Sequence, residues 1–135
     1  MKKVIVLLLL LSFTWLQGAE DDFTTQVSLE KDQFQTLVVH EEKILHVLKF
    51  RWTLYANDGL VMHLNYDDRV SQFILYNQYK KATYKVRLLP KKTLSKQAAF
   101  LYLTFNKFDY KEKKAYFDIL VNDPEEQALI EVKEK

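Results

Sequence analysis

Three histidines, together with neighbouring carboxylates, are the residues of this sequence whose types suit metal binding or acid–base chemistry. His40 and His46 flank a pair of glutamates, which resembles the helical zinc motif, although in that motif the histidines lie four residues apart. Here the spacing is six, and six residues along a helix turn the second histidine to a different face. On strands, a metal ion would need a further ligand such as His63 or an acidic residue. We therefore predict no metal site.

Pairs of carboxylates catalyse glycoside hydrolysis. In this sequence, adjacent acidic residues occur at Asp21-Asp22, Glu41-Glu42, Asp67-Asp68 and Glu125-Glu126. A catalytic pair faces across a cleft, whereas neighbours on a strand point to opposite faces of the sheet. A serine nucleophile commonly sits on a glycine-flanked turn, and no such turn surrounds Ser28, Ser71 or Ser95. We therefore predict no catalytic residues and no enzymatic activity.

Glycine is scarce and cysteine is absent, since Gly18 and Gly59 are the only glycines of the chain. Loops that bind phosphates or dinucleotides need several glycines, so that backbone N–H groups can approach the anion. Without cysteine the chain forms no disulfide, no thiolate metal site and no lipidated cysteine. The composition thus excludes nucleotide-dependent enzymes of these classes, and we predict no cofactor.

Charge is strongly segregated along the chain. Residues 69 to 108 carry nine basic residues and no acidic residue. Residues 20 to 68 carry four basic and ten acidic residues, and residues 109 to 135 carry five and eight. The three net charges are therefore −6, +9 and −3, so the neutral total of residues 20 to 135 conceals a basic middle.

The basic middle supports two interpretations. In the first, basic strands lie beside acidic neighbours and the charges compensate; Lys85, Arg87 and the following Pro90 are typical of an edge strand that avoids unwanted pairing. In the second, basic and tyrosine side chains form a patch that attracts an anionic partner. The predicted partner-binding residues are Tyr76, Tyr79, Lys80, Lys81, Tyr84, Lys85, Arg87, Lys91, Lys92 and Lys96.

The elements that must position these residues are predicted to be short strands, because apolar and polar residues alternate over short runs from residue 23 to residue 121. The clearest run spans residues 44 to 56. It places on one face Ile44, Leu48, Phe50, Trp52 and Leu54. On the other face lie Lys49, Arg51, Thr53 and Tyr55. One apolar face and one mostly polar face indicate a strand that covers a core.

A hairpin is predicted where Asn57, Asp58 and Gly59 interrupt this run, since residues 60 to 66 resume the alternation. A three-residue loop with Gly59 in the left-handed conformation keeps the apolar residues of both strands on one face. The expected register pairs Trp52 with Leu64, Phe50 with Tyr66, and Lys49 with Asp67. We also expect Gly59 to resist substitution.

Further strands are predicted at residues 23–30, 34–40, 70–77, 82–89, 98–106 and 115–121. Their number and short connections predict an all-β fold, an antiparallel β-sandwich of immunoglobulin-like type, with a small closed β-barrel as the alternative. Residues 20 to 135 form a single β domain in this interpretation. Residues 123–135 form either a short helix, because Asp123 and Pro124 resemble a helix start, or an edge strand.

The N-terminus resembles a secretory signal peptide. Lys2 and Lys3 precede an apolar run over residues 4 to 16, which is too short for the roughly 20 residues that span a bilayer as a helix. We predict a signal peptide over residues 1–19, cleaved after Ala19 or Gly18. The expected location is the periplasm or the cell exterior, with no transmembrane segment after cleavage.

Export, the missing catalytic motifs and the charge segregation together favour an interaction or structural module of the cell envelope. The expected partner is an envelope protein or an anionic envelope component, and nucleic acid is not expected outside the cytoplasm. The alternative is a carrier of small ligands, in which the many aromatic residues line a cavity instead of filling a core.

Overall fold

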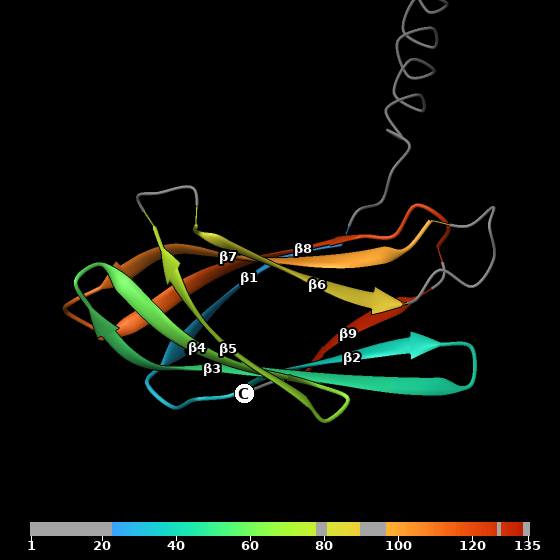
Figure 1. Cartoon of the computed structure of the whole chain (residues 1–135), viewed down its shortest axis with the longest axis horizontal. Helices are drawn as coiled ribbons and strands as arrows, with labels where there is room; N and C mark the ends of the chain where they lie inside the picture. Colours follow the sequence, from blue (N-terminus) through green and yellow to red (C-terminus); the bar gives the residue numbers. More distant parts are fainter. Residues whose placement is uncertain (1–22, 78–80, 90–96, 127, 134–135) are drawn as a thin grey trace, which may run out of the picture.

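The computed structural model describes residues 23–77, 81–89, 97–126 and 128–133. Within these ranges the chain forms nine strands and no helix (Figure 1). The strands are β1 (Phe23–Glu30), β2 (Gln35–Glu41), β3 (Ile44–Ala56), β4 (Gly59–Tyr66), β5 (Arg69–Tyr76), β6 (Thr83–Leu89), β7 (Ala99–Asp109), β8 (Lys114–Asn122) and β9 (Leu129–Lys133). Each strand predicted between residues 23 and 122 is present, with ends that differ by at most three residues. The predicted signal peptide lies outside the described residues.

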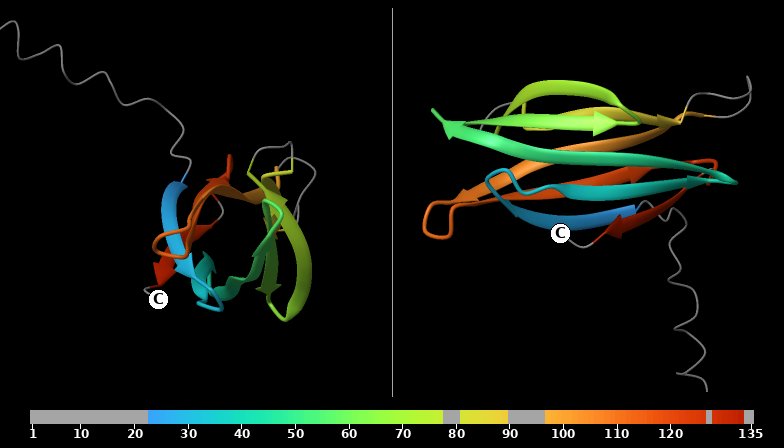
Figure 2. Two further views of the ribbon diagram at one scale, coloured as in Figure 1. Left: turned by 90° about the vertical axis from the view of Figure 1, so that its left-hand side faces the viewer. Right: turned by 90° about the horizontal axis from the view of Figure 1, so that it is seen from below.

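The strands form two antiparallel sheets that face each other (Figure 2). Sheet A has the order β1-β8-β7-β6, and sheet B has the order β5-β4-β3-β2-β9. Alternate residues of each strand point into the space between the sheets, where Phe50 of sheet B meets Phe117 of sheet A at a centroid distance of 5.6 Å. Two antiparallel sheets around one core agree with the predicted β-sandwich, and the described strands do not close into the alternative barrel.

The strand order consists of consecutive hairpins. Strands β2 to β5 follow one another within sheet B, and β6 to β8 follow one another within sheet A. In immunoglobulin domains the second and third strands belong to different sheets, whereas here β2 and β3 are hydrogen-bonded neighbours. The first and last strands break the sequential order, because β1 pairs with β8 and β9 pairs with β2.

The β3–β4 hairpin forms where it was predicted, but the predicted register is wrong. Asn57 and Asp58 both have positive φ angles, 53° and 62°, and make a two-residue turn between Ala56 and Gly59. A register shift between Trp52 and Leu54 then restores the pairing of apolar residues. The observed pairs are Trp52 with Met62, Phe50 with Leu64, Leu48 with Tyr66 and Lys49 with Asn65.

Gly59 does not adopt the left-handed conformation that the predicted loop required, since no glycine in the described residues has a positive φ. Its lack of a side chain matters for another reason. A Cβ atom at this position would lie 2.8 Å from Cε1 of Tyr76 and 3.1 Å from Cγ2 of Ile74. Glycine is therefore favoured here by the close approach of β5.

Of the two forms predicted for the C-terminal segment, a short helix and an edge strand, the structure has the edge strand. Residues 129–133 form β9, which pairs with β2 at the edge of sheet B. Asp123, which was a candidate helix cap, instead accepts a hydrogen bond from the backbone N–H of Ala128 at 2.8 Å. It also accepts one through its main-chain oxygen from the N–H of Glu126 at 3.1 Å. These bonds hold a turn that leads the chain from sheet A to sheet B.

Candidate functional site

Lys85 and Arg87 of the predicted patch lie on the outer face of sheet A. Both are exposed, and most of the residues that alternate with them on β6 are buried between the sheets. β6 is an edge strand, as its basic residues indicated. Across on β7, Tyr102 lies opposite Lys85, and Phe100 lies opposite Arg87. The cross-strand neighbours of these two basic residues are therefore aromatic and uncharged.

Basic groups on this face lie over aromatic rings. Lys85 Nζ lies 4.0 Å from the ring centroid of Phe100 and 5.7 Å from that of Tyr102. Lys107, further along β7, places its Nζ 4.8 Å from the ring centroid of Tyr116 on β8. Contacts of this kind at exposed sites each contribute about 0.5–1 kcal/mol and leave the cation open to solvent. We name this surface the basic–aromatic face; it consists of Lys85, Arg87, Phe100, Tyr102, Lys107 and Tyr116.

Direct charge compensation does not occur on the basic–aromatic face within the described residues. The ion pairs among these residues do not include Lys85, Arg87 or Lys107. Asp118 of β8 is a carboxylate close by, and its Oδ2 accepts a hydrogen bond from Nδ2 of Asn106 at 3.2 Å. The interpretation that neighbouring acids pair with the basic strand is thus not supported for β6.

The structure does not bring the described tyrosines of the predicted patch to this face. Tyr84 is half-buried and stacks on Phe73 of β5, with ring centroids 3.7 Å apart and planes at 7°. Tyr76 ends β5, on the opposite sheet, against Gly59. Lys81 is exposed and precedes β6. The other predicted members lie outside the described residues: Tyr79, Lys80, Lys91, Lys92 and Lys96.

Sequence reasoning missed the aromatic members of the face. Phe100, Tyr102 and Tyr116 lie on the outer side of β7 and β8, where alternation along each strand places them. The same alternation separates Tyr84 from Lys85, because neighbours on a strand point to opposite sides. The alternation that predicts the strands could therefore have placed these rings on the outer face. This would have required a decision on which side of each strand is buried.

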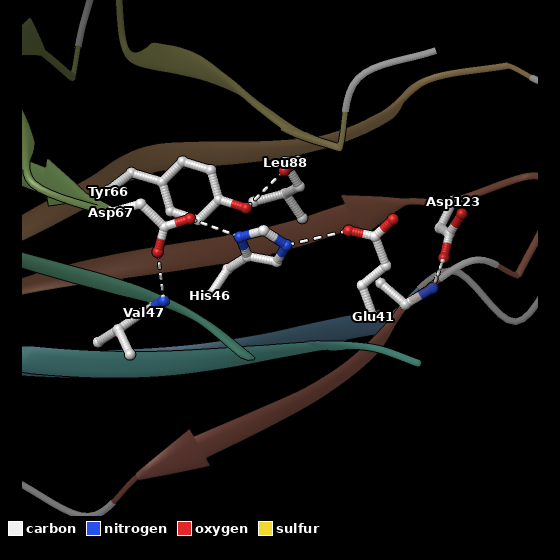
Figure 3. A network of polar contacts seen from close by, with 8 residues as sticks. Glu41, His46, Val47, Tyr66, Asp67, Leu88 and Asp123 are labelled. Atoms are coloured by element: carbon white, nitrogen blue, oxygen red, sulfur yellow. Dashed lines mark hydrogen bonds and ion pairs between the residues drawn. The ribbon is translucent and has the colours of Figure 1, made fainter. Parts of the chain in front are cut away.

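A second polar cluster joins His46 to two carboxylates (Figure 3). Nδ1 of His46 lies 2.5 Å from Oδ2 of Asp67, and Nε2 lies 3.0 Å from Oε2 of Glu41. The other oxygen of Asp67 accepts a hydrogen bond from the backbone N–H of Val47 at 2.9 Å. The ring of Tyr66 lies beside His46, and its hydroxyl donates to the carbonyl oxygen of Leu88 on sheet A.

Hydrogen bonds and charge favour the protonated form of His46. Burial by itself lowers the pKa of His46, but the hydrogen bonds and charges of Asp67 and Glu41 raise it above its ordinary value of 6.5. Burial raises the pKa of Asp67, and its hydrogen bonds with His46 and Val47 outweigh this effect and lower it. With both ring nitrogens donating, the imidazolium holds the β2–β3 hairpin to the turn after β4.

This cluster is not arranged for nucleophilic or metal chemistry. Both nitrogens of His46 already contact carboxylates, so neither is available to activate a hydroxyl group. His40 instead pairs with Glu131 on β9 at 3.0 Å, and His63 contacts the hydroxyl of Thr53 at 3.2 Å. Across the described ranges, no group of three or more ligand residues is arranged to hold a metal ion. The three histidines thus occupy separate surroundings.

An aromatic groove of about 370 Å³ lies at one end of the sandwich. Its walls are Trp52, Leu54, Tyr55, Phe108 and Tyr110, with Lys31 and Lys113 also lining it. The rings of Tyr55 and Phe108 stack with centroids 4.1 Å apart. The hydrogen bond from Tyr110, together with burial, raises the pKa of Tyr55 to about 12. The hydroxyl of Tyr55 thus stays a neutral hydrogen-bonding group beside an apolar surface at physiological pH.

Comparisons with known proteins gave no match for this chain. No protein-family model matches it, and no curated protein or solved structure is similar enough to count as a match. Within the described residues, no helix is long and apolar enough to cross a membrane. The function is therefore inferred from the chemistry of the basic–aromatic face and of the aromatic groove.

Proposed function

We propose that this protein is an exported, non-enzymatic interaction module of the cell envelope, and that its basic–aromatic face binds an anionic partner. The proposal depends on one observation: Lys85 and Arg87 stand on an outer sheet face beside aromatic rings, with no described carboxylate in an ion pair with them. Binding through this face needs only a sheet whose inner side is packed against a second sheet. The order of the strands need not be that of an immunoglobulin domain.

The composition of the face suits an anionic protein or polymer. Guanidinium and ammonium groups attract carboxylates and phosphates, and the guanidinium of Arg87 can bind either group with two hydrogen bonds. Phe100, Tyr102 and Tyr116 add apolar area that a partner can cover. The predicted signal peptide supports an envelope partner, since export would bring the face to periplasmic or external anions.

Crosslinking capture from the native envelope tests the proposal. The protein is compared with the double variant Lys85→Glu/Arg87→Glu and with a charge-matched control, Lys43→Glu/Lys49→Glu, whose exposed lysines belong to the β2–β3 turn and to β3 of sheet B. We expect the wild type and the control to capture the same anionic partner and the double variant to lose at least about nine tenths of it.

Salt dependence is the second measurement. Exposed charges are screened within about 3 Å at 1 M ionic strength, so capture should fall severalfold between about 0.05 M and 1 M salt. An unchanged set of partners in Lys85→Glu/Arg87→Glu, or capture that survives high salt, would show that the face does not bind through its charge.

The aromatic groove favours a second candidate function, the carriage of a small ligand. The space between the sheets is filled by packed side chains, so a ligand would bind at the end of the sandwich and not within it. Trp52, Tyr55 and Phe108 suit an apolar or aromatic ligand, and the two lysines suit an acidic group on it.

Fluorescence of Trp52 reports on this groove. We expect the apolar anion anilinonaphthalene sulfonate to quench Trp52, and the variant Tyr110→Ala to weaken its binding by about tenfold, with Tyr102→Ala on the outer face of sheet A as the control. Equal affinity of both variants for anilinonaphthalene sulfonate would contradict the proposal that the groove binds a ligand.

A further inference from the structure

Three of the four edge strands of the described sheets carry charges on or beside their outer edges. β6 carries Lys85 and Arg87 and has a register shift after Arg87. β9 has five residues and carries Glu131 and Lys133. β1 ends in Glu30 and borders a groove whose wall includes Lys133 of β9. Charged side chains, bulges and short length are the devices by which natural edge strands avoid pairing with other chains.

β5 differs from these strands, because none of its residues after Arg69 is charged. It borders sheet B on the side away from β9 (Figure 2). It contains no proline, and its register with β4 has no shift. Val70 and Ile74 leave 72% and 47% of their surface exposed, so both apolar side chains are available to a partner. A smooth and uncharged edge of this kind is a template for pairing with a further strand.

The main-chain groups of β5 alternate in direction, as they do in any antiparallel strand, so that every second residue points its N–H and C=O groups to the same side. The N–H of Tyr76 points away from β4, since it donates to the oxygen of Lys81 at 3.2 Å. The main-chain groups of Val70, Gln72 and Ile74 therefore also point away from β4. No described residue forms a hydrogen bond with these groups. Three residues of β5 can thus pair with a further strand.

The inner side of β5 packs against sheet A and holds the strand in place. Phe73 stacks on Tyr84 of β6, and Leu75 is buried in the core. These side chains lie between the two sheets, whereas the outward main-chain groups lie in the plane of sheet B. The edge is therefore already extended before a partner binds, which lowers the entropy cost of pairing.

We infer that two copies of this chain associate through β5, and that the two strands pair antiparallel about a two-fold axis at Gln72. In this register Val70 of each copy lies opposite Ile74 of the other, and Gln72 lies opposite the same residue of the second copy. The main-chain groups of all three residues point outward, so each pair can exchange two hydrogen bonds. This interface is separate from the basic–aromatic face, which lies on sheet A.

Side chains and main chain favour the same register. The contact between Val70 and Ile74 covers two exposed apolar side chains in each copy. A shift of one residue would set outward main-chain groups opposite inward ones. A shift of two residues would place one of these apolar side chains opposite Gln72. Because the segment is complementary to itself, a second copy is the occupant that fits this edge.

The charged side chains at the ends of the paired segment nearly balance. The segment ends before Tyr76, and the register brings Asp68 and Arg69 of one copy toward Lys81 of the other, because Lys81 lies beside Tyr76. Asp68 attracts the lysine and Arg69 repels it. Asp67, in the same turn as Asp68, already contacts His46 of its own chain. Main-chain hydrogen bonds and apolar contacts therefore supply the affinity.

Sedimentation of the purified protein tests this inference. The paired segment is short, so we expect a weak dimer with a dissociation constant on the order of 100 µM. The average mass should rise toward twice that of a single chain between about 10 µM and about 1 mM protein. The variant Lys85→Glu/Arg87→Glu should associate like the wild type, so failure here is distinct from failure of the proposed function.

Charge exchange at Gln72 tests the two-fold axis itself. In Gln72→Lys and in Gln72→Glu, like charges would face each other across the axis, so each variant should associate at least about fivefold more weakly. An equimolar mixture sets lysine opposite glutamate and should regain the wild-type affinity within about twofold. The matched controls are Gln26→Lys and Gln26→Glu, at an exposed position of edge strand β1, which should associate like the wild type.

Amide hydrogen exchange locates the contact. At about 1 mM protein, exchange at Val70, Gln72 and Ile74 should be severalfold slower than at about 10 µM. Exchange at Ser71 and Phe73 should not change, because their N–H groups point toward β4. Any of three results would overturn the inference: single chains up to the highest concentration, equal association of the Gln72 variants and the wild type, or a mixture of these variants that does not associate.

Discussion

The two sides of the sandwich, where the sheets meet edge to edge, are built in different ways. On the side of β5 and β6, Phe73 stacks on Tyr84, and the buried Tyr66 donates its hydroxyl to the carbonyl oxygen of Leu88. On the side of β1 and β9, a groove separates the two edge strands. The first side is closed by side chains that cross between the sheets, whereas the second has a groove between its edge strands.

This difference shows that one side of a small fold can supply many of the contacts that hold its two sheets together. Cross-sheet contacts at β5 and β6 fix the relative position of the two sheets on that side. We therefore expect substitutions on the closed side to lower stability more than substitutions on the open side.

The largest effect is expected from the stacked rings of the closed side. Phe73→Ala and Tyr84→Ala should each lower the free energy of unfolding by about 2 kcal/mol, because each removes half-buried aromatic area from the core. Because the rings stack, the double variant should lose about 1 kcal/mol less than the sum. Urea denaturation measures all three, with Val132→Ala on the open side as control, expected to lose below about 1 kcal/mol.

A smaller effect is expected from the hydrogen bond that crosses the sheets. Tyr66→Phe keeps the ring but leaves the carbonyl oxygen of Leu88 without this donor, so unfolding should become easier by about 1–2 kcal/mol. Tyr102→Phe is the control, since its ring lies on the outer face of sheet A. Equal urea midpoints for the two variants would contradict the role of Tyr66 in closing this side.

The smallest effect is expected from the His46 cluster, and it depends on pH. Because folding raises the pKa of His46, the stabilisation is complete below 6.5 and is lost as the pH rises through the folded-state value. Because folding lowers the pKa of Asp67, its part is present above 3.8 and is lost as the pH falls through its folded-state value. The contribution is thus greatest between these two ordinary values.

His46→Gln should remove this pH dependence. We expect the variant to lose about 1 kcal/mol relative to the wild type near pH 5.5 and less than that near pH 8. His63→Gln, whose ring contacts a hydroxyl group and no carboxylate, is the control. A constant difference between wild type and His46→Gln across this range, measured by urea denaturation, would show that the charge on His46 contributes nothing.

Local alternation made the strands predictable, since each strand shows its buried face within a few neighbouring residues, as Leu48, Phe50 and Trp52 do. The hairpin register was not predictable in the same way. It depends on positive φ angles at Asn57 and Asp58 and on a shift after Trp52, both of which involve the partner strand. After this shift Leu54 is exposed, while Tyr55 packs against the core.

The candidate sites were predictable only in part. Lys85 and Arg87 share a face because they lie two residues apart on one strand. The rings beside them come from β7 and β8, and the sequence does not show which strands become neighbours. His46 meets Asp67 because β4 returns along β3, and it meets Glu41 across the β2–β3 turn. The groove along β1 depends on the last strand of the fold.

The order of strand pairing also sets when the chain can complete its fold. The consecutive hairpins of β2 to β5 and of β6 to β8 use contacts that are close in sequence and can form early. β1 has to wait for β8, which lies nearly at the other end of the chain. Until then, a chain that emerges from its N-terminus carries β1 with both edges unpaired. The first of the described strands is thus one of the last to be secured by pairing.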